Sequence, residues 1–135
     1  MKLSTIMVFS GLITFLSFQG FTEERKGKAV YEISPEKGMK LTDKALKNIE
    51  VKTASIATPY EATVPLESLV RSQDQVGVYR VREDWFKLIK VQVIEENSQE
   101  AQISGDFQQG DSLVTEGAGL LRVSELDAFG VVKNQ

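Results

Sequence analysis

The chain has 135 residues, of which 41% are apolar and 26% are charged, and its formal net charge at pH 7 is −3. This length and mixture are typical of one globular domain. The sequence contains neither cysteine nor histidine. It therefore excludes disulfides, thiol nucleophiles, Ser-His-Asp triads and zinc sites with nitrogen or sulfur ligands. An acidic balance without a basic cluster also argues against nucleic acid as a partner.

The first twenty residues have the layout of a secretory signal. Lys2 precedes an apolar run over residues 3–18, and the charged sequence TEERKGK follows soon after. This order predicts residues 1–20 to be a signal peptide and the protein to be exported. The run is shorter than the ~20 residues that a helix needs to cross a bilayer, which favours cleavage. The cleavage site is weak, because Phe18 stands where a small side chain is preferred, so an uncleaved N-terminal anchor is the alternative.

The next segment leads into a small domain. Residues 21–28 are expected to form a polar linker, and residues 29–33 a short strand. A turn should follow, because Pro35 lacks an amide donor and Gly38 tolerates positive φ.

A short helix is expected next. Thr42 can cap its N-terminus, and Asp43 would lie in its first turn, where an acidic side chain is favourable. Asn48 is a stop signal, and residues 49–56 then alternate like a strand. One apolar stripe would be formed by Ala45, Leu46 and Ile49.

Beyond Pro59 the pattern predicts strands only. SLVR and VGVYRVR suggest a hairpin across SQDQ, and REDW suggests another turn before the strand FKLIKVQVI. In that strand Ile89, Val91 and Val93 should face the core, opposite Lys90 and Gln92. EAQIS and residues 113–115 continue the strand pattern.

The segment AGLLRVSELDAF is expected to close the domain. Leu120, Leu121 and Leu126 would cover the core, and residues 130–135 should form a frayed tail. The predicted fold is mainly β: a small, partly closed β-barrel over residues 29–129 with one short helix.

Four residues around the REDW turn are candidates for contacting a partner protein: Arg80, Arg82, Trp85 and Phe86. Tryptophan is enriched at interface hot spots, and the arginines could pair with an acidic rim. In the alternative interpretation one ring caps the open end of the barrel, and the arginines pair locally with Glu83 and Asp84.

No catalytic, cofactor or metal site is predicted. Met39 is the only methionine outside the signal segment, and one thioether cannot hold a soft metal ion. The acidic runs lack the spacing of a calcium loop. Met39 is therefore expected to serve an ordinary packing role.

Four segments, in this order, are similar to parts of one protein family: LTDKALKNIEVKTASI, VPLESLV, VGVYRVREDWFKLIKVQV and ISGDFQQGDSLVTEGAGLL. Together they resemble the membrane-proximal part of periplasmic adaptor subunits (membrane fusion proteins) of resistance-nodulation-division (RND) efflux pumps. Within this family, the segments are most similar to the heavy-metal branch. The resemblance covers residues 33–129.

The resemblance implies a non-enzymatic periplasmic protein that acts in efflux, with metal ions as the cargo of the resembled branch. Its partners would be an inner-membrane RND transporter or full-length adaptor subunits. In a complete adaptor, a β-barrel, a lipoyl-like domain and a helical hairpin separate the KTASI and VP segments. Here only residues 57–63 do so, which predicts that residues 49–56 pair directly with strands downstream of Pro65.

Two alternatives remain open. The chain could be a folded remnant of an adaptor without a function of its own. It could also be a periplasmic ligand-binding or hydrolytic protein that uses carboxylates, although acid-base chemistry near neutral pH usually recruits histidine or a strongly perturbed carboxylate.

Overall fold

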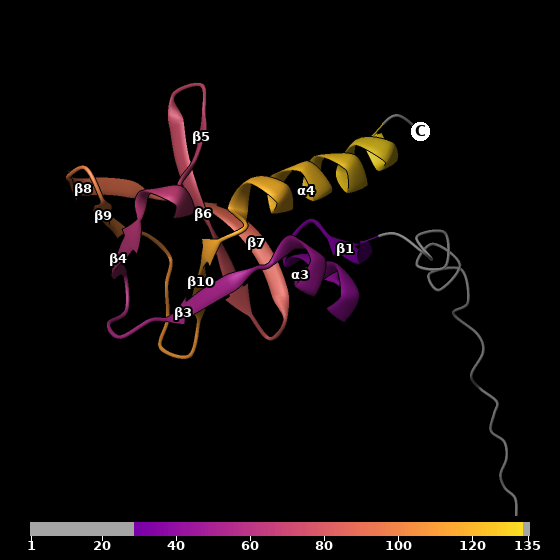
Figure 1. The fold of residues 1–135 in the computed structure, drawn as a ribbon, viewed down its shortest axis with the longest axis horizontal. Coiled ribbons are helices and arrows are strands. Elements are labelled where there is room, and N and C mark those ends of the chain that lie inside the picture. The colour runs from indigo at the N-terminus through magenta and orange to yellow at the C-terminus, as the bar shows by residue number, and fades with distance from the viewer. Residues whose placement is uncertain (1–28, 134–135) are drawn as a thin grey trace, which may run out of the picture.

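The computed structural model describes residues 29–133. The predicted signal peptide or anchor (1–20) and the polar linker (21–28) lie outside these residues. Within them, ten strands form two antiparallel sheets, accompanied by two α-helices and one 3-10 turn, η3 (Leu66–Ser68). The prediction of a mainly β fold is confirmed (Figure 1). The sheets remain separate and do not close into a barrel.

The larger sheet brings together strands from the N-terminal and C-terminal parts of the domain. Its strands lie in the order β1 (Val30–Ser34), β2 (Gly38–Leu41), β7 (Trp85–Lys90), β6 (Gln75–Arg82), β10 (Ser112–Glu116) and β3 (Lys52–Ser55), and β5 (Val70–Ser72) also pairs with β6. Strand β3 pairs antiparallel with β10, with Thr53 opposite Val114. The predicted pairing of residues 49–56 with a strand downstream of Pro65 is therefore confirmed.

The smaller sheet consists of β4 (Glu61–Pro65), β9 (Glu100–Ser104) and β8 (Gln92–Glu96). The expected single strand FKLIKVQVI is divided at Val91, because β7 and β8 belong to different sheets. The Val91 amide donates to the carbonyl of Val76 at 2.9 Å. The predicted alternation is confirmed: Ile89 and Val91 are buried and Val93 is half-buried, whereas Lys90 and Gln92 are exposed.

Helix α3 (Asp43–Ile49) begins as predicted, because the amide of Ala45 donates to Thr42 Oγ1 at 3.1 Å. It ends beyond Asn48, at Glu50, which takes the left-handed conformation with φ 62°. The Glu50 amide donates to the carbonyls of Leu46 and Lys47, so this residue satisfies the last turn.

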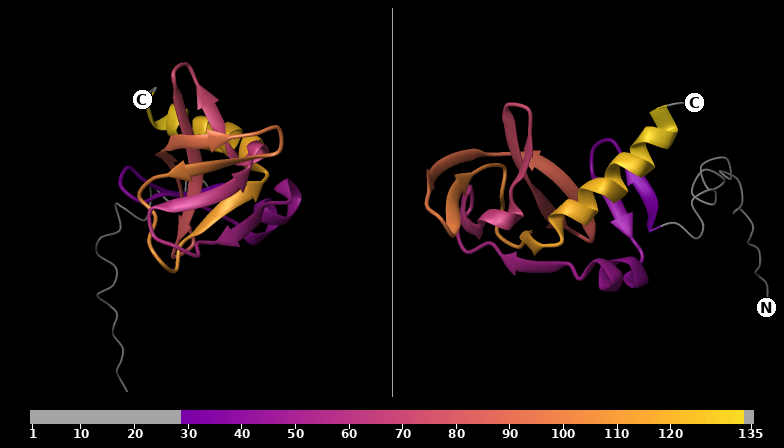
Figure 2. Two further views of the ribbon diagram at one scale, coloured as in Figure 1. Left: turned by 90° about the vertical axis from the view of Figure 1, so that its left-hand side faces the viewer. Right: turned by 45° about the horizontal axis from the view of Figure 1, so that its top comes forward.

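A second helix, α4 (Ala118–Lys133), was not expected, and it runs into the segment predicted to be frayed. It lies against β1 and β5 at the same end of the domain as α3 (Figure 2). Leu121 is fully buried, but Leu120 and Leu126 are more than half exposed, so only one of the three leucines covers the core. No helix within residues 29–133 has the length and apolar character needed to cross a bilayer.

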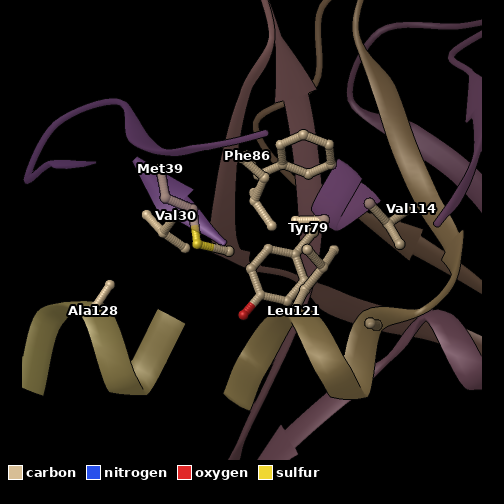
Figure 3. Packing of buried hydrophobic residues seen from close by; sticks show 10 residues of the cluster. Val30, Met39, Tyr79, Phe86, Val114, Leu121 and Ala128 are labelled. Carbon is tan, nitrogen blue, oxygen red and sulfur yellow. The ribbon is translucent and has the colours of Figure 1, made fainter. Parts of the chain in front are cut away.

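The buried side chains form two clusters. The first core consists of Val30, Met39, Leu41, Ala45, Tyr79, Phe86, Val114, Ala118, Leu121 and Ala128 (Figure 3). The second core consists of Ile56, Val64, Val78, Ile89, Val91, Ala101, Ile103, Phe107 and Leu113. Neighbours on one strand enter different cores, as Val78 and Tyr79 do on β6, because successive side chains point to opposite faces. Met39 is completely buried, which confirms its packing role.

Candidate docking site

The structure places the four candidate residues on the β6–β7 hairpin, where Arg82 is opposite Trp85. Glu83 and Asp84 form the turn with φ 54° and 69°. Two successive residues with positive φ match the twist of a tight hairpin. The four side chains do not form one surface: Arg80 and Phe86 are buried, and only Arg82 and Trp85 partly reach solvent.

Arg82 is held by a buried carboxylate. Its Nε and Nη2 donate to Asp111 Oδ1 and Oδ2, both at 2.8 Å, and the Gln108 amide donates to Asp111 Oδ2 at 2.8 Å. The Asp111 side chain is only 3% exposed. The hydrogen bonds from Arg82 and the Gln108 amide lower the pKa of Asp111, and the carboxylate raises the pKa of Arg82. This two-point pair fastens the loop before β10 to β6, so Arg82 has a structural partner within the domain.

Arg80 has a different environment. Its Nη1 donates to the carbonyl oxygen and to Oδ2 of Asp106, both at 3.0 Å, while its buried Nε has no hydrogen-bond partner. The Asp106 side chain is 67% exposed, whereas that of Arg80 is 8% exposed. The interpretation that both arginines pair with Glu83 and Asp84 is wrong. Their partners come from the loop between β9 and β10.

Sequence reasoning missed Asp106 and Asp111 as partners. Both follow glycines in the segment GDFQQGD, and Gly-Asp pairs in a sequence indicate turns and not ion-pair partners. The available signal was the coincidence of two acidic residues in one loop with two arginines spaced by two on one strand. Arg80 and Arg82 must lie on the same face of β6 because of that spacing.

The two aromatic residues separate into a surface ring and a core ring. Trp85 is half-buried beside the ammonium groups of Lys40 and Lys37, which lie 5.0 and 5.5 Å from the ring centroid. Such distances are within the range of cation–π attraction. Phe86 lies in the first core. It therefore packs inside the domain and does not cap the open end of a barrel, since the two sheets do not close into one.

A groove opens beside Phe86 and is called the acidic-rim groove below. Its apolar floor includes Leu46, Val81 and Phe86, and Asp43 and Asp84 line it as well. Its volume is about 330 Å³. The groove combines apolar area with two carboxylates, an arrangement suited to binding a partner side chain.

A second hollow with acidic lining is a weaker candidate for a binding site. A hollow between β8 and β9 is lined by Glu95, Glu96 and Glu100, but Glu96 already accepts hydrogen bonds from Arg71 at 3.1 and 3.2 Å. Across residues 29–133, no three acidic side chains are grouped so that they could hold a metal ion.

Comparisons with known proteins add no relative: no family model, no curated protein and no solved structure matches this chain. The similarity to efflux adaptors therefore stays a prediction from the residues.

Proposed function

We propose that this chain is an exported, non-enzymatic docking protein whose β-rich domain resembles the membrane-proximal domain of an efflux-pump adaptor. It acts in the periplasm, and its partner is an inner-membrane RND transporter or full-length adaptor subunits. It modulates the assembly of an efflux complex and does not carry the cargo itself.

The observation that supports this proposal is the antiparallel pairing of β3 with β10. By the resemblance, these two segments are separated in a complete adaptor by large inserted modules. Here the connection from β3 to β4 is short and held in place, because the Tyr60 amide donates to the Phe107 carbonyl at 3.1 Å and the Tyr60 carbonyl accepts from Gly105 at 3.0 Å. The two segments thus form one sheet without the inserted modules, which supports a docking domain that folds on its own.

The test is recovery of partners from a bacterial envelope extract with the tagged, exported chain as bait. We expect an RND transporter or a full-length adaptor to be enriched over a bait that carries only the signal segment and the tag. Recovery of neither would count against the docking role.

Two further measurements separate the alternatives. Deletion of the gene should change tolerance to metal ions or drugs, whereas a functionless remnant predicts unchanged tolerance and no partner. A thermal-shift screen should show no stabilisation by small molecules, and a clear hit would favour a periplasmic ligand-binding protein.

A further inference from the structure

The acidic-rim groove is built by segments that are distant in the sequence. Leu46 lines it from α3, and Val51 lines it from the position after Glu50, the residue that caps α3. The Val51 amide donates to the Leu46 carbonyl at 3.2 Å. Val81 and Phe86 are cross-strand partners on β6 and β7. These four side chains also pack against or belong to the first core. The floor of the groove is therefore an exposed margin of the first core, held by the fold itself.

Both edge strands of the larger sheet contribute to this groove. Tyr31 of β1 and Thr53 of β3 line it, and β1 and β3 are the two ends of the strand order. Strand β3 pairs only with β10 among the described strands, and all of its side chains are exposed. An exposed edge offers backbone donors and acceptors to an added extended segment, which is the geometry of strand-addition recognition.

The charged side chains that line the groove have one sign. Asp43 lies in the first turn of α3 and Asp84 in the β6–β7 turn, and both are exposed. No lysine or arginine of residues 29–133 lines the groove. A bound segment with lysine or arginine beside its apolar side chains would complement these carboxylates, and an acidic segment would be repelled.

We propose that the acidic-rim groove binds an extended peptide segment of a partner protein, in which large apolar side chains alternate with lysine or arginine. The apolar side chains cover the floor formed by Leu46, Val81 and Phe86. The basic side chains between them point away from the floor, and their long, flexible stems let their charged ends reach Asp43 and Asp84, which are both exposed at the groove. This inference deepens the proposed docking role, on which it rests for the choice of a protein partner.

The direct test uses capped, fluorescently labelled peptides and the folded protein at low salt. The first peptide alternates leucine with lysine, the second alternates leucine with glutamate, and the third alternates serine with lysine. We expect measurable binding of the first peptide alone, weakening as salt is added. Equal binding of the leucine–glutamate peptide would show that the groove does not require basic side chains. Equal binding of the serine–lysine peptide would show that it does not require apolar ones. Either result would overturn the proposal.

Two double variants test whether the peptide binds in the acidic-rim groove. Asp43→Asn combined with Asp84→Asn keeps the size of both side chains, and asparagine tolerates the left-handed backbone at position 84. This double variant should weaken binding of the leucine–lysine peptide by about tenfold. Circular dichroism should confirm that it remains folded.

The matched control is Glu67→Gln combined with Glu83→Gln. It removes the same net charge from exposed positions that do not line the groove. Binding should remain at the wild-type level. Equal weakening by both double variants would show non-specific attraction to an acidic protein and would overturn the assignment.

The same variants separate this inference from the proposed function. If the wild-type bait recovers a transporter or adaptor and the Asp43→Asn, Asp84→Asn bait recovers it equally, the groove assignment is wrong while the docking role stands. If the peptide tests succeed but no efflux component is recovered, the groove assignment stands and the efflux role is wrong.

Discussion

The two cores lie on opposite faces of the same strands and are closed in different ways. The second core is covered by the smaller sheet and filled by aliphatic side chains and Phe107. The first core is covered by α3 and α4 and contains Tyr79 (Figure 3). The Tyr79 hydroxyl donates to Glu125 Oε1 at 2.6 Å. The first core also opens into the acidic-rim groove. The helix-covered side thus carries the Tyr79–Glu125 contact and the candidate binding surface. The Arg80 and Arg82 ion pairs lie on the face of β6 that Val78 shares with the second core.

The largest expected effect tests whether the two cores unfold together. Phe107→Ala empties a fully buried position in the second core and should lower the free energy of unfolding by about 3–5 kcal/mol. Leu121→Ala in the first core should lower it by about 2–5 kcal/mol. Urea unfolding followed by far-UV circular dichroism and by the fluorescence of the single tryptophan, Trp85, should give coincident midpoints for each variant.

Separate midpoints would show that the two cores unfold as independent units. In that case Phe107→Ala would move the circular dichroism transition and leave the Trp85 transition in place. Phe107→Leu, which keeps most of the buried volume, is the control and should have a much smaller effect.

The next effect contrasts the two arginine pairs of β6. Asp111→Asn leaves Arg82 without its carboxylate and should lower the free energy of unfolding by about 2 kcal/mol. The value is below the usual range for a broken buried pair because the Arg82 side chain is 33% exposed. Arg80→Met should change stability by less than about 1 kcal/mol, since Arg80 already has an unpaired Nε and its partner is mostly in water. A greater loss in Arg80→Met than in Asp111→Asn would reverse the assignment of which pair matters.

The Arg82–Asp111 pair also makes the stability of the domain depend on pH in the acid range. The folded-state pKa of Asp111 is lowered, mainly by the hydrogen bonds from Arg82. Its stabilisation is therefore fully present above the unfolded-state value of about 3.9 and is lost as the pH falls through the lower folded-state value. Urea midpoints measured from neutral pH down to pH 3 should fall less steeply in Asp111→Asn than in wild type; parallel curves would contradict this.

A smaller effect is expected in the first core. Tyr79→Phe removes the hydrogen bond to Glu125 and should lower the free energy of unfolding by about 1 kcal/mol, because Arg122 still pairs with Glu125 at 3.0 Å. Burial, then the contact with Glu125, raises the pKa of Tyr79. The corresponding stabilisation is present below about pH 10 and is lost as the pH rises further. Wild type should thus lose stability at high pH more steeply than Tyr79→Phe, as measured by urea unfolding at alkaline pH.

The smallest effect is a gain. Glu50 closes α3 in the left-handed conformation, which disfavours any residue with a Cβ. Glu50→Gly should raise the free energy of unfolding by up to about 1 kcal/mol, reduced by the greater freedom of glycine in the unfolded chain. Thermal unfolding measures the gain, and Glu50→Ala, which keeps the Cβ, should not reproduce it.

The sequence predicted most of what depends on local pattern. The alternation around Ile89 and Val91 and the cap at Thr42 are governed by neighbours in the chain, and both are confirmed. Helix α4 was missed because its apolar residues are not confined to one face and Gly119 and Gly130 weaken the helical signal.

The candidate site was predicted less well, for a physical reason. Arg80 and Arg82 were expected to pair with a partner protein or with Glu83 and Asp84, whereas their carboxylate partners within the domain depend on how the loop between β9 and β10 folds over β6. Phe86 was a candidate anchor, yet its burial depends on β2, on the other side of β7. The acidic-rim groove joins segments that only the tertiary fold brings together.

The pairing of β3 with β10 also orders events in time. Lys52 lies opposite Glu116, which is far from it in the sequence, while hairpins such as β6–β7 join close neighbours. Closing a long loop before its contacts form slows folding, so the hairpins should assemble first and β3 should find its place last. During synthesis on the ribosome, β3 emerges well before β10, its one partner among the described strands, so this part of the larger sheet can form only after β10 has emerged.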